Sequence, residues 1–190
     1  MEREELVRRI LHCLIALAPI YFLIPDDLPV INVRRWVLLI IFLGAISIFD
    51  AWRRRKKITF LGLRPHEREG VASFAWAAAG ITFVLWLIPK DLATAALIGM
   101  AFVDPLSGEL RHIYARSIFV PALAFVAYFT LVFSTLAVWG DHDIAACALI
   151  AAIGSAVAVP SEAIKVRYLD DDFSMLVFPA VVMRMVAEAV

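Results

Sequence analysis

Aspartates at two places in the chain have the type and spacing that bind a cation. Asp170, Asp171 and Asp172 are consecutive and lead directly into the apolar run 173–190. Adjacent carboxylates repel one another, and one or two at a helix start suffice to cap the free N–H groups and to favour the dipole. A third carboxylate suggests a bound cation, because hard oxygen ligands suit the Mg²⁺ that carries a nucleotide's phosphates. The alternative is an N-cap beside solvated charge.

Asp104 is the second such position. It ends the apolar run 95–103 and is followed by Pro105, which we expect to stop the helix from continuing normally. A carboxylate at the buried mouth of a helix bundle either pairs with a cation, here Arg111, or holds a metal. We favour the metal.

Three other features place ionisable residues at the ends of apolar runs. His12 lies one helical turn inside the first run, where an interhelical hydrogen bond is the commoner role for a lone histidine. Glu162 follows Pro160, where the sixth run is expected to break up, and its alternative role is that of a loop carboxylate paired with a nearby cation. The basic residues 53–57 are interpreted as a topological anchor.

Seven apolar runs position these residues, at 10–25, 36–50, 72–89, 92–103, 118–139, 144–160 and 173–190. Hydrophobic residues make up 63% of the 190, and the mean hydropathy is +0.85. A helix of roughly 17–25 residues crosses the bilayer core, so 92–103 spans it only by borrowing residues on both sides. We therefore predict an all-α, multi-pass integral membrane protein, with residues 1–190 forming one domain of about seven transmembrane helices.

Basic charge predicts the orientation, because Lys and Arg are retained on the cytoplasmic side. With a cytoplasmic amino terminus, only Arg34, Arg35 and Lys90 fall in outside connections, and Arg184 lies within the last run. The carboxyl terminus is then outside. A six-span alternative, with 92–103 as a re-entrant hairpin, breaks this alternation. The inside connections are also the richer in polar residues, so we expect any active site at the cytoplasmic face.

Five short motifs follow one another along the chain. They are Glu-Leu-Val-Arg-Arg-Ile-Leu-His at 5–12, Phe-Asp-Ala-Trp-Arg-Arg at 49–54, Arg-Pro-His-Glu at 64–67, Phe-Val-Asp-Pro-Leu-Ser at 102–107, and Glu162 with Leu-Asp-Asp-Asp-Phe-Ser at 169–174. Their order resembles the polyprenol kinase family of dolichol kinases, phytol kinases and CTP-dependent diacylglycerol kinases. The CDP-lipid synthases are more distantly related to this family.

The chain departs from the family pattern in the segment associated with nucleotide. Val103 replaces a Gly, Asp172 replaces the usual Asn, and Arg111 falls one residue early, with His112 where the family has Arg. The family's Lys-Ser-x-Glu-Gly segment, implicated in phosphate contact, has no counterpart after Arg116. Arg111, His112 or Arg116 would substitute, because Arg holds phosphate bidentately.

The resemblance implies a membrane lipid kinase that transfers the γ-phosphoryl group of CTP, or another nucleoside triphosphate, to an isoprenoid or other lipid alcohol. The implied site has Mg²⁺ on Asp104, Asp170 and Asp171, phosphate on Arg111, His112, Arg116 and Arg64, and Glu162 or His12 as general base. The small-residue stretch 77–80 permits close helix packing near a lipid groove. The alternatives are a non-catalytic lipid-binding relative and a CDP-lipid synthase-like cytidylyltransferase. No DNA- or RNA-binding motif is present, so no nucleic-acid partner is expected.

Overall fold

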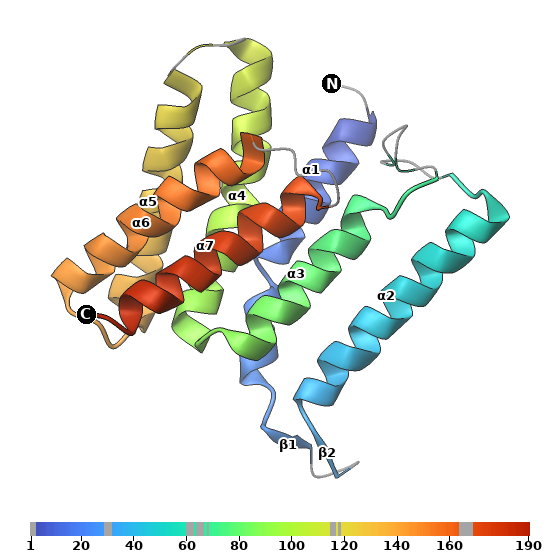
Figure 1. Cartoon of the computed structure of the whole chain (residues 1–190), viewed down its shortest axis with the longest axis horizontal. Coiled ribbons are helices and arrows are strands. Elements are labelled where there is room, and N and C mark those ends of the chain that lie inside the picture. The colour runs from blue at the N-terminus through green and yellow to red at the C-terminus, as the bar shows by residue number, and fades with distance from the viewer. Residues whose placement is uncertain are drawn as a thin grey trace.

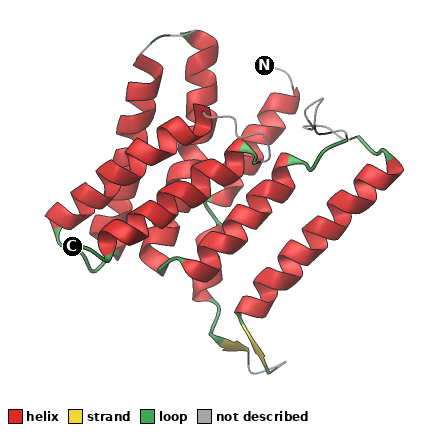
Figure 2. Ribbon diagram, in the orientation of Figure 1, coloured by secondary structure: helices red, strands yellow, loops and turns green. Residues whose placement is uncertain are grey.

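The chain folds into a bundle of α-helices, as the computed structural model shows (Figures 1 and 2). The structure describes residues 3–28, 32–59, 63, 67, 69–114, 117, 119–163 and 169–190. Their elements are α1 (Arg3–Ile15), the 3₁₀ helix η1 (Ala18–Leu23), β1 (Asp27–Leu28), β2 (Val33–Arg34), α2 (Trp36–Lys56), α3 (Ser73–Leu87), α4 (Lys90–Ile113), α5 (Phe119–Trp139), α6 (Ile144–Ala163) and α7 (Asp171–Ala187). The two strands pair antiparallel as a short hairpin at one end of the bundle.

The all-α prediction is confirmed, and six of the seven apolar runs each lie largely within one α-helix of the described residues. The first run, 10–25, is instead divided between the end of α1 and η1. The shortest run, 92–103, is extended in both directions to Lys90–Ile113. The expectation that Pro105 interrupts this helix is wrong, and α6 likewise continues through Pro160. An interior proline removes one N–H···O=C bond, but helices held by neighbours on several sides tolerate that loss.

The core of the bundle surrounds α4, which packs against α1, α3, α5 and α7. Its residues from Leu92 to Val103 are nearly all buried. Small residues allow the helices to approach closely: a Cβ at Gly99 would lie 2.8 Å from the ring of Tyr128. A Cβ at Gly154 would similarly lie 2.6 Å from the sulfur of Met183. Close backbone approach of this kind is typical of helices that pack within a membrane.

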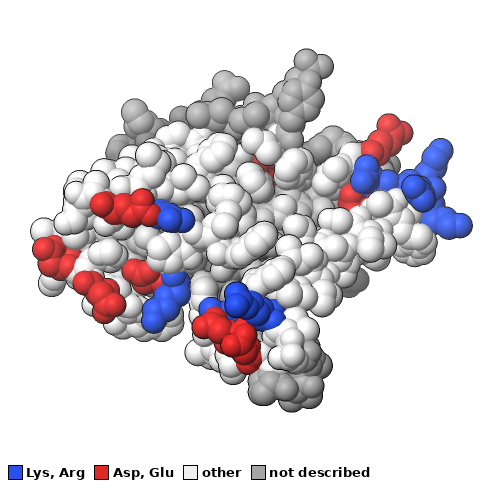
Figure 3. Space-filling model, turned by 60° about the horizontal axis from the view of Figure 1, so that its bottom comes forward, with Lys and Arg blue, Asp and Glu red and all other residues white. Residues whose placement is uncertain are grey.

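The outer surface of the bundle is strongly apolar. Helix α2 lies at the edge of the bundle and packs chiefly on α3, so that Ile48 is 72% exposed. Within the described residues, three segments are long and apolar enough to cross a membrane: α2, α5 and residues 144–161 of α6. Figure 3 shows charged side chains at the margins of one face, with a broad uncharged surface between them. Exposed apolar area of this extent is rare on water-soluble monomers.

Candidate functional site

Three polar side chains from three helices converge in the interior. His12 of α1 has its Nε2 atom 3.2 Å from Asp104 Oδ2 of α4 and 3.2 Å from Asp172 Oδ1 of α7. His12 and Asp172 are buried, and the Asp104 side chain is 16% exposed. One ligand atom from each residue lies within 4.8 Å of the other two. The structure thus brings together His12 and Asp104, which the sequence analysis singled out separately.

The three facing atoms of this cluster need a hydrogen or a cation between them. Two carboxylate oxygens and an imidazole nitrogen with no proton between them would present only lone pairs to one another in a poorly solvated place. Either a proton on His12 Nε2 or on a carboxyl group supplies hydrogen bonds, or a cation lies among them. Both arrangements are ways of satisfying buried charge, and only the second also provides a reactive centre.

The donor set suits a hard divalent cation on the side of the two aspartates. Asp104 and Asp172 supply carboxylate oxygens, which Mg²⁺ prefers, whereas the nitrogen of His12 is less suited to it. Ser107 follows Asp104 by one helical turn on the same face of α4. Its Oγ atom is buried and has no hydrogen-bond partner within the described part of the chain. These residues therefore fit Mg²⁺ held by Asp104 and Asp172, with His12 beside it.

The three consecutive aspartates have different positions at the start of α7. Asp170 is the N-cap, and its Oδ1 accepts a hydrogen bond from the backbone N–H of Asp172 at 3.1 Å. Burial, together with the nearby negative charges of Asp172 and Asp171, raises the pKa of Asp170 to about 7. Asp171 is half-buried in the first turn. Asp172, which was not among the predicted metal ligands, is the aspartate that meets His12.

A cavity of about 230 Å³ begins at this cluster. Its polar lining consists of His12, Asp172, Glu67 and Ser73. The rest of its lining is apolar and comes from α1, α2, α3 and the loop before α3: Leu11, Ile15, Phe42, Ile46, Leu63, Phe74, Ala77, Ala78 and Ile81. The predicted small-residue stretch 77–80 thus contributes to this wall. A cavity with a polar end and an apolar body fits an amphipathic ligand whose polar group is small.

Arg53 connects the end of α2 to Glu67 and Gly70, which precede α3. It is 0% exposed, and its guanidinium donates to Asp50 Oδ1 from Nη2 at 2.7 Å and from Nε at 3.1 Å. It also donates to the backbone carbonyls of Glu67 at 3.1 Å and Gly70 at 2.9 Å. Arg53 therefore has a structural role in addition to the topological one predicted for residues 53–57, which stays a prediction. Its pairing with Asp50, three residues earlier on the same helix face, was the available sequence signal.

Glu67 is a buried residue for which the sequence predicted no individual role. It is 2% exposed, and its Oε1 atom accepts a hydrogen bond from Ser73 Oγ at 2.9 Å. Because Arg53 holds the backbone of Glu67, the carboxylate is fixed at the polar end of the cavity. The cavity lining therefore contains a second carboxylate, Glu67, in addition to Asp172.

The predicted phosphate-binding residues lie farther from the cluster or outside the described residues. Arg111 and His112 are exposed in the last turn of α4. Arg111 follows Asp104 by seven residues, so it lies on the same helix face about 10 Å farther along the axis. Arg64 and Arg116 lie outside the described residues. Glu162 belongs to the last turn of α6, and its side chain lies outside the described part of the structure.

Comparison with known proteins gives no relative for this chain: no family model, no curated protein and no solved structure matches it. The functional interpretation therefore depends on the chemistry of the site. That chemistry consists of a buried histidine that lies between the carboxylates of Asp104 and Asp172, at a largely apolar cavity that His12 and Asp172 line.

Proposed function

We propose that the protein is an integral membrane lipid kinase, which transfers the γ-phosphoryl group of CTP or another nucleoside triphosphate to an isoprenoid or other lipid alcohol. The observation that carries the proposal is the His12–Asp104–Asp172 cluster at the polar end of an apolar cavity. The apolar body of that cavity fits a hydrocarbon chain, and its polar end fits one hydroxyl group. The motif order that resembles polyprenol kinases supports the same reaction.

The two aspartates have the role of holding the nucleotide's cation. Asp104 and Asp172 would bind Mg²⁺, which supplies neutralisation of the phosphate charge when it is bound. Asp170 contributes the N-cap that sets the position of Asp172, and Asp171 adds negative potential beside it. Arg111 and His112, with Arg64 and Arg116, are the proposed phosphate contacts, since guanidinium groups bind phosphate oxygens in pairs.

His12 is the proposed general base, because it both lines the cavity and contacts the carboxylates. The lipid hydroxyl oxygen attacks the γ-phosphorus, and its proton passes to His12 Nε2 or to the adjoining carboxylates. A new O–P bond forms as the bond from the γ-phosphorus to the β,γ-bridging oxygen breaks, and the nucleoside diphosphate leaves with that electron pair. Glu162 remains the alternative base.

The proposed topology has seven transmembrane helices, with a cytoplasmic amino terminus and an outside carboxyl terminus. The distribution of Lys and Arg supports this orientation. The end of α2, the start of α3 and the start of α7 are then cytoplasmic, so the cluster would face the compartment that contains nucleotides. The apolar surface of α2 supports its contact with lipid.

Transfer of labelled γ-phosphate tests the proposal. Purified protein in lipid–detergent micelles would be incubated with γ-³²P-labelled CTP or ATP, Mg²⁺ and a panel of isoprenoid alcohols, fatty alcohols and diacylglycerol. We expect a labelled lipid phosphate, which Asp172→Asn abolishes and the exposed control Asp141→Asn preserves. Release of pyrophosphate instead would identify a cytidylyltransferase. Absence of both products, with no nucleotide bound, would leave the non-catalytic lipid-binding alternative.

A further inference from the structure

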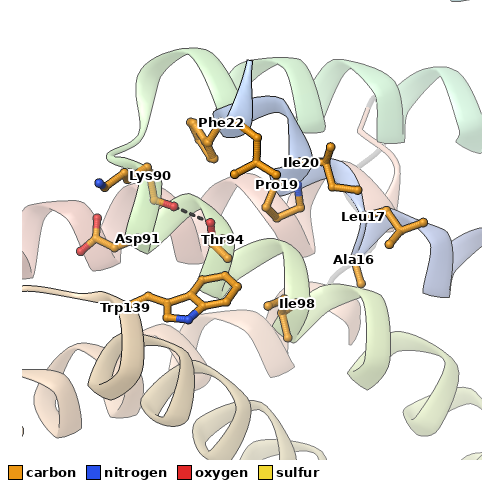
Figure 4. A pocket seen from close by; sticks show the side chains of 11 residues that line it. Ala16, Leu17, Pro19, Ile20, Phe22, Lys90, Asp91, Thr94, Ile98 and Trp139 are labelled. Carbon is orange, nitrogen blue, oxygen red and sulfur yellow. Dashed lines mark hydrogen bonds between the residues drawn. The ribbon is translucent and has the colours of Figure 1, made fainter. Parts of the chain in front are cut away.

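A second cavity lies at the other end of the bundle from the His12 cluster. Its volume is about 510 Å³, and it is bounded by η1, the start of α4 and the end of α5 (Figure 4). None of the residues in its lining belongs to the candidate active site. Because α4 begins at Lys90 and carries Asp104 about four turns farther along, the Lys90 end of this cavity is distant from the His12 cluster.

The change from α1 to η1 shapes one wall of this cavity. Helix α1 ends at Ile15, and the chain continues as a 3₁₀ helix with Pro19 in its first turn. Proline has no N–H to continue the α-helical ladder, and the 3₁₀ helix places side chains at a different angular spacing. Leu17, Pro19 and Ile20 belong to this wall, and Ile98 and Trp139 line the cavity from α4 and α5 (Figure 4).

The mouth of the cavity presents one cation and one carboxylate side by side. Lys90 is exposed, and its ammonium group has no ion-pair or hydrogen-bond partner among the residues that the structure describes. Asp91 Oδ2 lies 3.3 Å from His142 Nε2, whereas no partner of its Oδ1 atom is found in the same part of the chain. The Thr94 hydroxyl already donates to the Lys90 carbonyl at 2.6 Å (dashed line in Figure 4). The charged groups available to a ligand are therefore the Lys90 ammonium and the Asp91 carboxylate, and the indole N–H of Trp139 is a further donor in the lining.

We propose that this cavity binds a zwitterionic phospholipid of the phosphatidylethanolamine type. The lipid phosphate contacts Lys90, the lipid ammonium donates to Asp91 Oδ1, and one acyl chain lies along Leu17, Ile20 and Ile98. Trp139 is 62% exposed at the end of α5, where an indole ring lies at the level of lipid headgroups.

Selectivity in this site comes from the headgroup. Within a bilayer, an acyl chain gains no hydrophobic energy by leaving other chains for an apolar groove, because both surroundings are equally apolar. The paired charges of Lys90 and Asp91 therefore decide which lipid stays. A choline headgroup has no N–H to donate to Asp91, and a glycerol headgroup has no positive charge to place there.

Native mass spectrometry of the full-length protein in detergent tests this site, with the first bound lipid measured for three phospholipids of identical acyl chains. The probes are phosphatidylethanolamine, phosphatidylcholine and phosphatidylglycerol. We expect the ethanolamine lipid to bind at least about fivefold more tightly than either other lipid, since one favourable charge contact at a membrane surface contributes about this factor. Lys90→Gln and Asp91→Asn should each remove this preference, and Lys56→Gln, an exposed cation at the end of α2, should leave it unchanged.

The alternative results are distinguishable. Equal affinities for the three lipids, or a preference that survives both substitutions, would overturn the proposal. A preference for phosphatidylglycerol that only Lys90→Gln removes would also overturn it, because the site would then recognise negative charge alone. Neither Lys90 nor Asp91 belongs to the proposed kinase site, so these measurements stand or fail independently of kinase activity.

Discussion

Replacing Arg53 by methionine should destabilise the protein more than any change to its exposed basic neighbours. Methionine keeps an unbranched apolar chain about as long as the aliphatic part of arginine, but it removes the guanidinium from a fully buried position. It leaves Asp50 without its closest cation, and it deprives the carbonyls of Glu67 and Gly70 of their donors. Breaking one side of a buried ion pair costs about 3–5 kcal/mol.

For Arg53→Met we expect a loss of stability at the lower end of this range, about 3 kcal/mol. Arg54 Nε lies 3.0 Å from Asp50 Oδ2, so part of the negative charge stays compensated after the substitution. A loss of about 3 kcal/mol corresponds to a fall in Tm of about 6–12 °C for a chain of this size. The assay is thermal unfolding in detergent, with Arg55→Met as the matched control, since exposed substitutions usually stay within about 0.5 kcal/mol.

A double substitution separates the ion pair from a simple loss of packing. Asp50→Leu combined with Arg53→Met removes both charges and should recover part of the lost stability, because no uncompensated charge then stays buried. Equal melting temperatures for Arg53→Met and Arg55→Met would refute the reasoning, as would a double variant less stable than either single one.

Three further outcomes are expected. Asp172→Asn should weaken Mg²⁺-dependent nucleotide binding at least about tenfold, or about 1.4 kcal/mol, with a smaller loss in Asp171→Asn; titration calorimetry compares them, and equal losses would contradict the assignment. Ala77→Trp, which projects into the cavity beside His12, should raise the KM for the lipid alcohol and leave nucleotide affinity unchanged, and an unchanged KM would place the lipid elsewhere. A cysteine introduced at position 55 should react with impermeant reagent only from the cytoplasmic side, and one at position 27 only from outside; the reverse pattern would invert the proposed topology.

The helices could be predicted because each has a long apolar run, and the apolar runs are separated by charged or proline-containing connections. His12 and Asp104 could be singled out for the same reason, as ionisable residues within or directly after such runs. The sequence does not show that they meet. Their contact depends on the packing of α1 against α4, which follows from tertiary structure.

Which of the three aspartates contacts His12 depends on the residue at which α7 begins. With Asp170 as N-cap, Asp172 is the second helical residue and its side chain turns toward His12. A start one residue later would turn another carboxylate inward, and three identical residues carry no signal to decide between them. The prediction that Pro105 ends the helix failed for a different reason. The local helix-breaking tendency of proline is overridden by the packing of α4 against helices on both sides.

Equilibrium binding of CTP to the unmodified protein tests the central claim most directly. If the buried cluster holds the cation of a nucleotide, CTP should bind only in the presence of Mg²⁺, and Asp104→Asn and Asp172→Asn should each abolish that binding while the protein stays folded in detergent. If CTP and ATP both fail to bind the unmodified protein, or if binding persists without Mg²⁺ and in both variants, His12, Asp104 and Asp172 are not a nucleotide site and the kinase proposal is wrong.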